Sequence, residues 1–116
     1  MKQENFKEID PNGIDQHAKG AKLDAGKTRW DLVPLDMIEG VAEILTFGAQ
    51  KYTEGGWKEV RNAKERYYSA MMRHYKQMIN GELIDTESGQ PHWKHFLTNA
   101  IFLGYFFDKD LKNGTK

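Results

Sequence analysis

Two acidic side chains on one predicted helix face are the first candidates for chemistry. Glu39 and Glu43 are four residues apart, and Thr46 and Gln50 continue the same row. A helix places side chains at this spacing on one face. Two neighbouring carboxylates repel each other unless a cation lies between them, and Mg²⁺ prefers oxygen ligands. The pair is therefore a candidate Mg²⁺ site, with an ordinary solvated helix edge as the alternative.

A second group of carboxylates follows the end of the next predicted helix. Glu82, Asp85 and Glu87 come shortly after Gly81, a residue type that commonly ends helices. These carboxylates could complete a metal site. They could equally cap the following helix, because the dipole at a helix N-terminus stabilises negative charge. The residues favour neither interpretation over the other.

Three of the four histidines are predicted to converge. His92, His95 and Asn99 share one face of the last predicted helix, and His74 lies on the apolar stripe of the preceding one. A single such histidine is usually a hydrogen-bonded core residue, but three beside an acidic loop form a candidate pocket. Histidines combined with carboxylates also bind Zn²⁺ or Mn²⁺, so the residues leave the identity of the metal open.

Cations and aromatic side chains could bind a phosphorylated ligand. Lys22, Lys27 and Arg29 lie in a glycine-containing loop and can hold phosphates through charge-assisted hydrogen bonds. A solvated loop, with Asp24 and Asp31 compensating the charge, is the alternative. A flat aromatic ring near such a site could stack a base, although most of these rings are expected in the core. The rings in question are Tyr52, Trp57, Tyr67, Tyr68 and Trp93.

Three helices are expected to position these residues, which makes the fold class all-α. Apolar residues recur at helical spacing over 36–52 and again between Asn62 and Gly81. Asp36 with Glu39, and Asn62 with Glu65, predict capping boxes at the two starts. A third helix is predicted over 91–109 after a loop at 82–90. Its apolar residues lie on nearly all sides, so we expect it at the centre of a compact bundle of three to four core helices.

Length and composition set the remaining limits. The 116 residues suit one domain, which we place at 21–111 between an irregular arm at 1–20 and a flexible tail at 112–116. Equal numbers of basic and acidic residues, 17 of each, argue against a partner that is a nucleic-acid polymer. The absence of cysteine excludes disulfides and thiolate metal sites. A polar N-terminus and no long apolar stretch predict a cytoplasmic protein with no membrane contact.

An ordered set of short motifs runs through most of the chain. They are Lys22-x-Asp24-x-Gly26-Lys27-x-Arg29-x-Asp31-Leu32-x-Pro34, Phe47-Gly48-Ala49-x-Lys51-Tyr52, Trp57, Arg73-His74, Gly81-Glu82-x-x-Asp85-x-Glu87-Ser88-Gly89-x-Pro91-His92-x-x-His95 and Asn99. In this order and spacing, they resemble the phage-type dATP/dGTP diphosphohydrolase family. That family is similar to the MazG-like all-α nucleoside triphosphate pyrophosphohydrolases.

The resemblance implies hydrolysis of a purine deoxynucleoside triphosphate, dATP or dGTP, to the monophosphate and pyrophosphate. It also implies a divalent metal (Mg²⁺, with Mn²⁺ as the alternative), a phage or prophage origin, and a homo-oligomer, either a dimer or a tetramer. MazG-like enzymes hold Mg²⁺ with an acidic row on one helix, which Glu39 and Glu43 match, and a Glu-x-x-Asp pair on another. Glu82 and Asp85 have the residue types of that pair, but they follow Gly81 and so lie beyond the predicted helix.

The resemblance also implies roles for individual residues. We hypothesise that Glu39, Glu43 and His74 are catalytic. The expected metal ligands are Glu39, Glu43, Glu82, Asp85, His92 and His95. The expected substrate-binding residues are Lys22, Asp24, Lys27, Arg29, Lys51, Tyr52, Trp57, Arg73 and Asn99.

Two other functions use the same residues. One is a binding module that sequesters a nucleotide and catalyses nothing, for which the cations and aromatic rings suffice. The other is a metal-dependent phosphohydrolase centred on the histidines, which would release triphosphate or inorganic phosphate instead of pyrophosphate. Turnover separates the first from an enzyme, and the identity of the products separates the second from a pyrophosphohydrolase.

Overall fold

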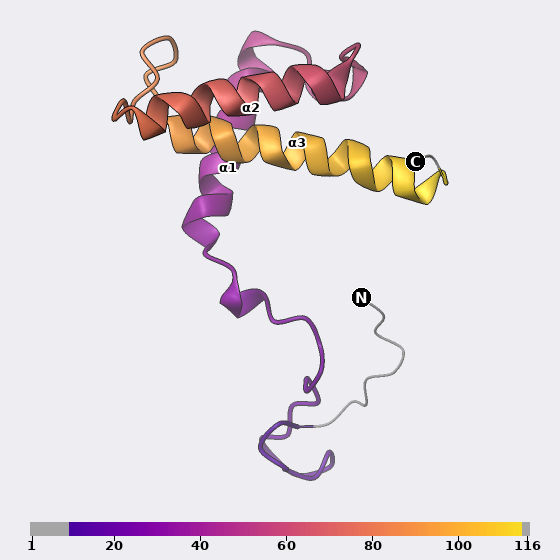
Figure 1. Cartoon of the computed structure of the whole chain (residues 1–116). Helices are drawn as coiled ribbons and strands as arrows, with labels where there is room; N and C mark the ends of the chain where they lie inside the picture. Colours follow the sequence, from indigo (N-terminus) through magenta and orange to yellow (C-terminus); the bar gives the residue numbers. More distant parts are fainter. Residues whose placement is uncertain (1–9, 115–116) are drawn as a thin grey trace. The chain divides into compact units, whose positions relative to one another are not determined.

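The computed structural model describes residues 10–114 (Figure 1). The chain divides into two compact units at the junction between Pro34 and Leu35, and each unit is described by itself. Over residues 10–34, the first unit contains turns and one short 3₁₀ helix, η1 (Trp30–Leu32). The buried Asp10 organises its loop, because the carboxylate accepts backbone N–H groups from both Asn12 and Lys22 at 2.7 Å.

The second unit is built from three α-helices. They are α1 (Leu35–Lys51), α2 (Ala63–Ile79) and α3 (His92–Lys112), with a 3₁₀ turn, η2 (Gly56–Glu59), between the first two. Figure 1 shows α2 and α3 side by side, with α1 crossing them. Helix α3 packs against both of the others, which confirms that it is the central element. The described residues contain no β-strand, so the all-α prediction is also confirmed.

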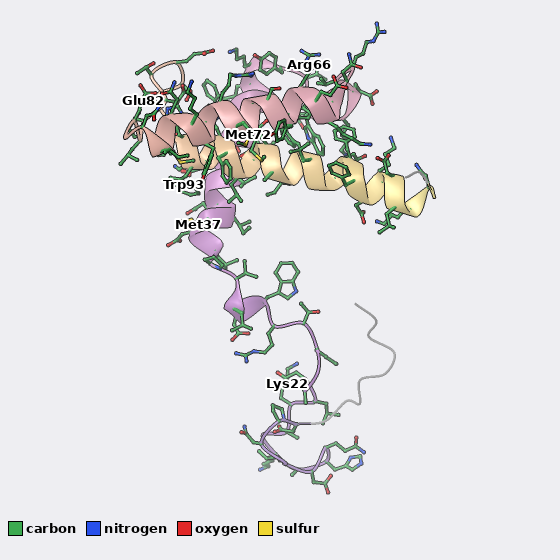
Figure 2. All side chains as sticks on the ribbon, viewed as in Figure 1. Lys22, Met37, Arg66, Met72, Glu82 and Trp93 are labelled. Carbon is green, nitrogen blue, oxygen red and sulfur yellow. The ribbon has the colours of Figure 1, made fainter. Side chains whose placement is uncertain are left out.

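The crossing of α1 and α3 depends on a glycine. Gly40 is buried in α1, and a Cβ atom at this position would lie 2.4 Å from Cη2 of Trp93 on α3. Figure 2 shows Trp93 at the crossing. Since real Cβ atoms are not found this close to other heavy atoms, only glycine allows the two helices to approach at this point.

The start of α2 differs from its prediction. Asn62 precedes the helix, but its φ of 55° lies in the left-handed region and its side chain makes no capping hydrogen bond. The capping box predicted from Asn62 and Glu65 is therefore wrong. Asparagine tolerates left-handed backbone better than most residues, and it serves here in the turn from η2 into α2.

The loop between α2 and α3 folds back on itself. Ile84 and Pro91 form an isolated antiparallel bridge, and the backbone N–H of His92 donates to the carbonyl of Leu83 at 2.9 Å. Gly89, with a φ of 74°, makes the reversal possible. The predicted loop is confirmed, and its closed geometry brings its carboxylates back to the first turn of α3.

Aromatic rings join η2, α2 and α3. Trp57 stacks on the buried Phe102 with ring centroids 4.4 Å apart, and Tyr67 lies 4.8 Å from the same ring. The Tyr67 hydroxyl donates to the carbonyl of Trp57 at 2.8 Å. Burial raises the pKa of Tyr67. This aromatic cluster joins α2 and α3 at a different point along the helix pair from the histidines.

Many large apolar side chains remain exposed in the helical unit. Among the described residues, the buried hydrophobic side chains are Val41 and Phe102. On α1, Leu35, Ile38 and Leu45 share one face and are all exposed, although an amphipathic helix normally buries such a stripe. None of the described helices is long and apolar enough to cross a membrane.

Candidate functional site

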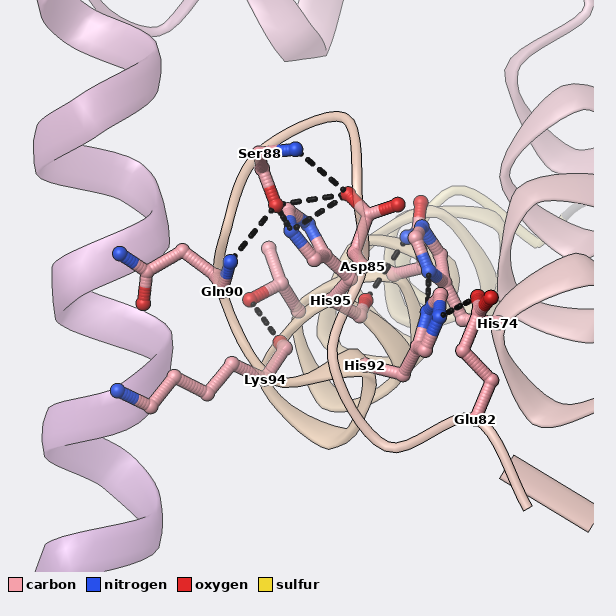
Figure 3. Close-up of polar contacts among 10 residues, drawn as sticks. His74, Glu82, Asp85, Ser88, Gln90, His92, Lys94 and His95 are labelled. Carbon is pink, nitrogen blue, oxygen red and sulfur yellow. Dashed lines mark hydrogen bonds and ion pairs between the residues drawn. The ribbon is translucent and has the colours of Figure 1, made fainter. Parts of the chain in front are cut away.

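Three histidines from two helices meet at one end of the α2–α3 pair (Figure 3). His92 is 2% exposed, and its Nδ1 lies 2.8 Å from Nδ1 of His74. The rings of His74 and His95 are stacked, 4.6 Å apart and 11° from parallel. The predicted convergence of the histidines of the last two helices is therefore confirmed.

A carboxylate determines the tautomer of the buried histidine. Glu82 Oε2 lies 2.7 Å from Nε2 of His92, and an ionised carboxylate can only accept a hydrogen bond. Nε2–H of His92 therefore donates to Glu82, and in the neutral ring Nδ1 accepts from Nδ1–H of His74. The chain His74–His92–Glu82 is a hydrogen-bonded relay that leaves Nε2 of His74 with a lone pair.

Ser88 connects the acidic loop to the third histidine. Its Oγ lies 2.7 Å from both Asp85 Oδ2 and His95 Nε2. Burial acts to raise the pKa of Asp85, but hydrogen bonds from the Ser88 hydroxyl and from the backbone of Ser88 and Glu87 lower it overall. The ionised Asp85 accepts from the hydroxyl, so Nε2–H of His95 donates to Ser88. The serine thus orients both side chains at once.

The cluster has the composition of a metal site. His74, Asp85 and His92 each offer one ligand atom, and these atoms all lie within 4.8 Å of one another. The pKa of His74 is lowered by burial and by the neighbouring His95 and His92, and burial also lowers the pKa of His95. Lowered pKa values keep the imidazoles neutral, which is the form that binds a metal.

These pKa shifts predict that acid destabilises the helical unit. The folded-state pKa values of His74 and His95 lie below the ordinary 6.5, so the unfolded chain binds more protons as the pH falls through that value. The contribution of these neutral histidines to the free energy of unfolding is fully present above pH 6.5. It is lost progressively as the pH falls from 6.5 to the folded-state pKa values. Urea unfolding one unit above and one unit below 6.5 should show a lower midpoint at the acidic pH.

A histidine outside the cluster provides the control for this prediction. His17 is exposed and lies in the N-terminal unit. His74→Gln should flatten the dependence of the urea midpoint on pH, whereas His17→Gln should leave it unchanged. An equal effect of the two substitutions would show that the cluster does not cause the acid sensitivity.

Glu39 and Glu43 do not belong to this cluster. Both are exposed on α1, and Oε1 of Glu43 pairs with Nζ of Lys94 at 2.8 Å. Figure 3 shows Lys94 extending from α3 toward α1. The two carboxylates line an open groove of about 400 Å³. Its other lining residues are Ala42, Thr46, Phe47 and Gln50, so the predicted polar row is confirmed as one face of the helix.

Arg73 and Asn99 line a second pocket, of about 570 Å³. Arg73 directly precedes His74 on α2, and the Asn99 side chain donates to the carbonyl of His95 at 2.8 Å. The pocket therefore extends along α2 as far as the residue before His74, and none of the three histidines lines it. Its other lining residues are Val60, Glu65, Arg66, Tyr67, Ser69 and Ala70.

The other predicted substrate-binding residues lie elsewhere in the chain. Arg29 pairs with Asp31 at 2.6 Å. Tyr52 is 66% exposed at the end of α1, with Nζ of Lys51 5.2 Å from its ring centroid. Trp57 is packed into the aromatic cluster. The predicted residues that belong to the N-terminal unit are Lys22, Asp24, Lys27 and Arg29.

Three residues of these sites were not among the sequence-predicted site residues. Ser88 holds Asp85 and His95, Lys94 pairs with Glu43, and Arg66 lines the pocket of Arg73. A loop serine next to a glycine is typical of a helix cap, and a single cation on a helix is too common to indicate a site. The role of Lys94 follows from a contact between positions 43 and 94, which are far apart in the sequence, so spacing alone does not indicate it. Ser88 lies within seven residues of both its partners, but these contacts depend on how the loop folds back onto α3.

The helices and the cluster together define a class of protein. It is a small all-α domain in which histidines and carboxylates gather at one end of a helix pair, with an arginine-lined pocket along the same pair. A family model described as dATP/dGTP diphosphohydrolase, N-terminal, matches residues 17–114. Because this match covers most of the chain, the chain belongs to that family.

A phage protein is a relative of this chain. A dATP/dGTP diphosphohydrolase of Salmonella phage PMBT28 is 31% identical over 84 residues, which cover 72% of this chain and 28% of the relative. The chain thus corresponds to somewhat more than a quarter of the length of that protein. No solved structure matches the chain significantly.

Proposed function

We propose that this chain hydrolyses a purine deoxynucleoside triphosphate, dATP or dGTP, to the monophosphate and pyrophosphate with the help of a divalent metal. The observation that carries the proposal is the histidine–carboxylate cluster beside an arginine-lined pocket, in a chain of the dATP/dGTP diphosphohydrolase family. Hydrolysis of a triphosphate requires positive charge around the phosphates and a positioned water. The arginines of the pocket supply the positive charge, and the histidine–carboxylate cluster can position the water.

The pocket of Arg73 suits the phosphates and their sugar. Its volume of about 570 Å³ lies in the usual range for small-molecule sites. Arg66 and Arg73 provide guanidinium groups, which bind phosphate oxygens through paired hydrogen bonds, and Asn99 offers an amide. The carboxylate of Glu65 in the same pocket can accept a hydrogen bond from a ribose or base group.

The groove on α1 fits Mg²⁺. Glu39, Glu43, Thr46 and Gln50 all offer oxygen atoms, which are the ligands that Mg²⁺ prefers. When bound, the ion would lower the pKa of a coordinated water and neutralise phosphate charge. Lys94, which is paired with Glu43, would be free to bind a phosphate oxygen once that carboxylate binds a cation.

The relay through His92 equips His74 to accept a proton. Nε2 of His74 carries the lone pair, while Nδ1–H donates to His92, which in turn donates to Glu82. A positive charge on His74 after proton transfer is then stabilised by a carboxylate two hydrogen bonds away. His74 is therefore the candidate general base for the attacking water.

Product analysis tests this function. The purified chain is incubated with each deoxynucleotide and ribonucleotide triphosphate and with Mg²⁺ or Mn²⁺, and the products are separated by ion-exchange chromatography. Monophosphate and pyrophosphate, formed from dATP or dGTP and abolished by EDTA, are the expected result. Release of triphosphate or inorganic phosphate would support the histidine-centred phosphohydrolase instead. Tight binding of nucleotide by the folded chain without turnover would support the sequestering module.

The exposed apolar stripe on α1 supports a homo-oligomer, a dimer or a tetramer. Leu35 is 63% exposed and Ile38 is 46% exposed, and extended apolar patches on a protein surface are typical of interfaces. Light scattering of the purified chain should give the mass of two or four chains. Ile38→Lys should reduce that mass, because a charge cannot be buried in an apolar contact without a partner. A monomeric mass for the unsubstituted chain would contradict the proposal.

A further inference from the structure

We propose that His74, Asp85 and His92 bind a divalent first-row transition metal, such as Zn²⁺ or Mn²⁺, at a site separate from the Mg²⁺ groove on α1. The three ligand atoms come from α2, from the folded-back loop and from the first residue of α3, and they lie within 4.8 Å of one another. This inference goes beyond the proposed hydrolysis and does not depend on it. In the metal-loaded chain His74 would be a ligand, and the relay that makes it a base would belong to the metal-free chain.

The donor atoms distinguish the two sites. Imidazole nitrogens suit Zn²⁺, Mn²⁺ and related ions, whereas Mg²⁺ prefers oxygen and keeps several waters. The cluster offers two imidazoles and one carboxylate, while the α1 groove offers carboxylate, hydroxyl and amide oxygens. Two different ions would therefore occupy the two sites.

Neighbouring side chains already hold the ligands in place. Histidines that bind metals usually donate their second ring N–H to a carboxylate, which fixes the tautomer, and His92 donates to Glu82 at 2.7 Å. The carboxylate of Asp85 is also held in place, since the Ser88 hydroxyl and the Ser88 backbone N–H both donate to its Oδ2. His92 is also buried, so its ring has little freedom to turn away.

The close approach of His74 and His92 points to the same conclusion. Their Nδ1 atoms face each other at 2.8 Å, so both rings direct a nitrogen into the same space. In the metal-free chain, the Nδ1–H of His74 points into this space. A divalent ion would replace that proton, with each ring then contributing a lone pair.

Titration of the full chain with Co²⁺ after dialysis against EDTA tests the proposal. Co²⁺ reports ligand number through its visible absorption, and Zn²⁺ and Mg²⁺ are added as competitors. The control substitution is His17→Gln, which removes the exposed histidine of the N-terminal unit. We expect one Co²⁺ per chain, displaced by Zn²⁺ but not by an excess of Mg²⁺, with His17→Gln binding as the unsubstituted chain does.

The variants separate ligands from their supporting residue. His74→Gln and Asp85→Asn should abolish the visible spectrum. Glu82→Gln should weaken Co²⁺ binding by about 10- to 100-fold, the usual effect of losing a carboxylate behind a metal-binding histidine. Glu82 is exposed, so this variant tests the site even where a substitution of His74 impairs folding, which circular dichroism monitors.

Two results would overturn the proposal. One is an unchanged Co²⁺ spectrum in both His74→Gln and Asp85→Asn, and the other is displacement of Co²⁺ by Mg²⁺ at similar concentrations. Neither result by itself contradicts the proposed hydrolysis, whose Mg²⁺ is placed in the α1 groove. Conversely, a chain that binds Co²⁺ at the histidines but leaves every nucleotide intact would contradict the proposed function alone.

Discussion

Replacing Glu39 with Gln is expected to reduce hydrolysis of dATP or dGTP by at least about 100-fold, while the chain remains folded. Removing a residue that only hydrogen-bonds to a metal ligand weakens metal affinity or activity by roughly 10- to 100-fold. Because Glu39 is proposed to bind the ion itself, its loss should have at least the larger of these effects. The side chain is exposed on α1, and Gln keeps its shape and its helix propensity. Initial rates at saturating Mg²⁺, together with circular dichroism, measure the effect.

Glu59 supplies the matched control. It is exposed in η2 and lies outside both pockets, so Glu59→Gln removes the same charge without touching the groove. The rate of this variant should equal that of the unsubstituted chain. Full activity of Glu39→Gln would remove Glu39 from the catalytic residues and would shift the search for the metal to the histidine cluster.

Gly40→Ala is expected to lower the free energy of unfolding by about 1–3 kcal/mol, the usual cost of overpacking a close contact. The added Cβ would lie 2.4 Å and 2.8 Å from two ring atoms of Trp93 and 3.2 Å from Cγ of Lys94. The rigid indole cannot yield as the end of a flexible side chain can. Relief therefore requires α1 and α3 to move apart.

Gly48 tests the same substitution on the same helix without the contact. A Cβ at Gly48 would meet nothing within 4 Å, so Gly48→Ala should stabilise the chain by up to about 1 kcal/mol through helix propensity. Urea unfolding of both variants measures the two changes in the free energy of unfolding, which should have opposite signs. Stabilisation by Gly40→Ala would mean that α1 and α3 do not cross closely at this point.

The same crossing connects stability to the proposed function. Lys94 touches both the position of Gly40 and the carboxylate of Glu43, and the adjacent residue His95 belongs to the cluster. Movement of α1 away from α3 would therefore break the ion pair between Lys94 and Glu43, while the lining of the groove, all of it on α1, would move together.

Local patterns in the sequence were sufficient to predict the helices and the faces they present. The spacing of apolar residues predicted three helices within three residues of their observed ends, and the spacing of His92 and His95 placed both rings on one side of α3. Such predictions succeed because helical periodicity depends on residues only three or four positions apart. The loop at 82–90 was equally predictable from Gly81 and Pro91.

Only the tertiary structure decided which faces meet. Both acidic groups were candidate ligands for one ion, yet Asp85 lies among the histidines while Glu39 and Glu43 line a separate groove. Likewise, Trp57 packs on Phe102. The physical reason is that contacts between distant segments depend on how helices cross, and the close crossing of α1 and α3 at Gly40 is recorded in no local pattern.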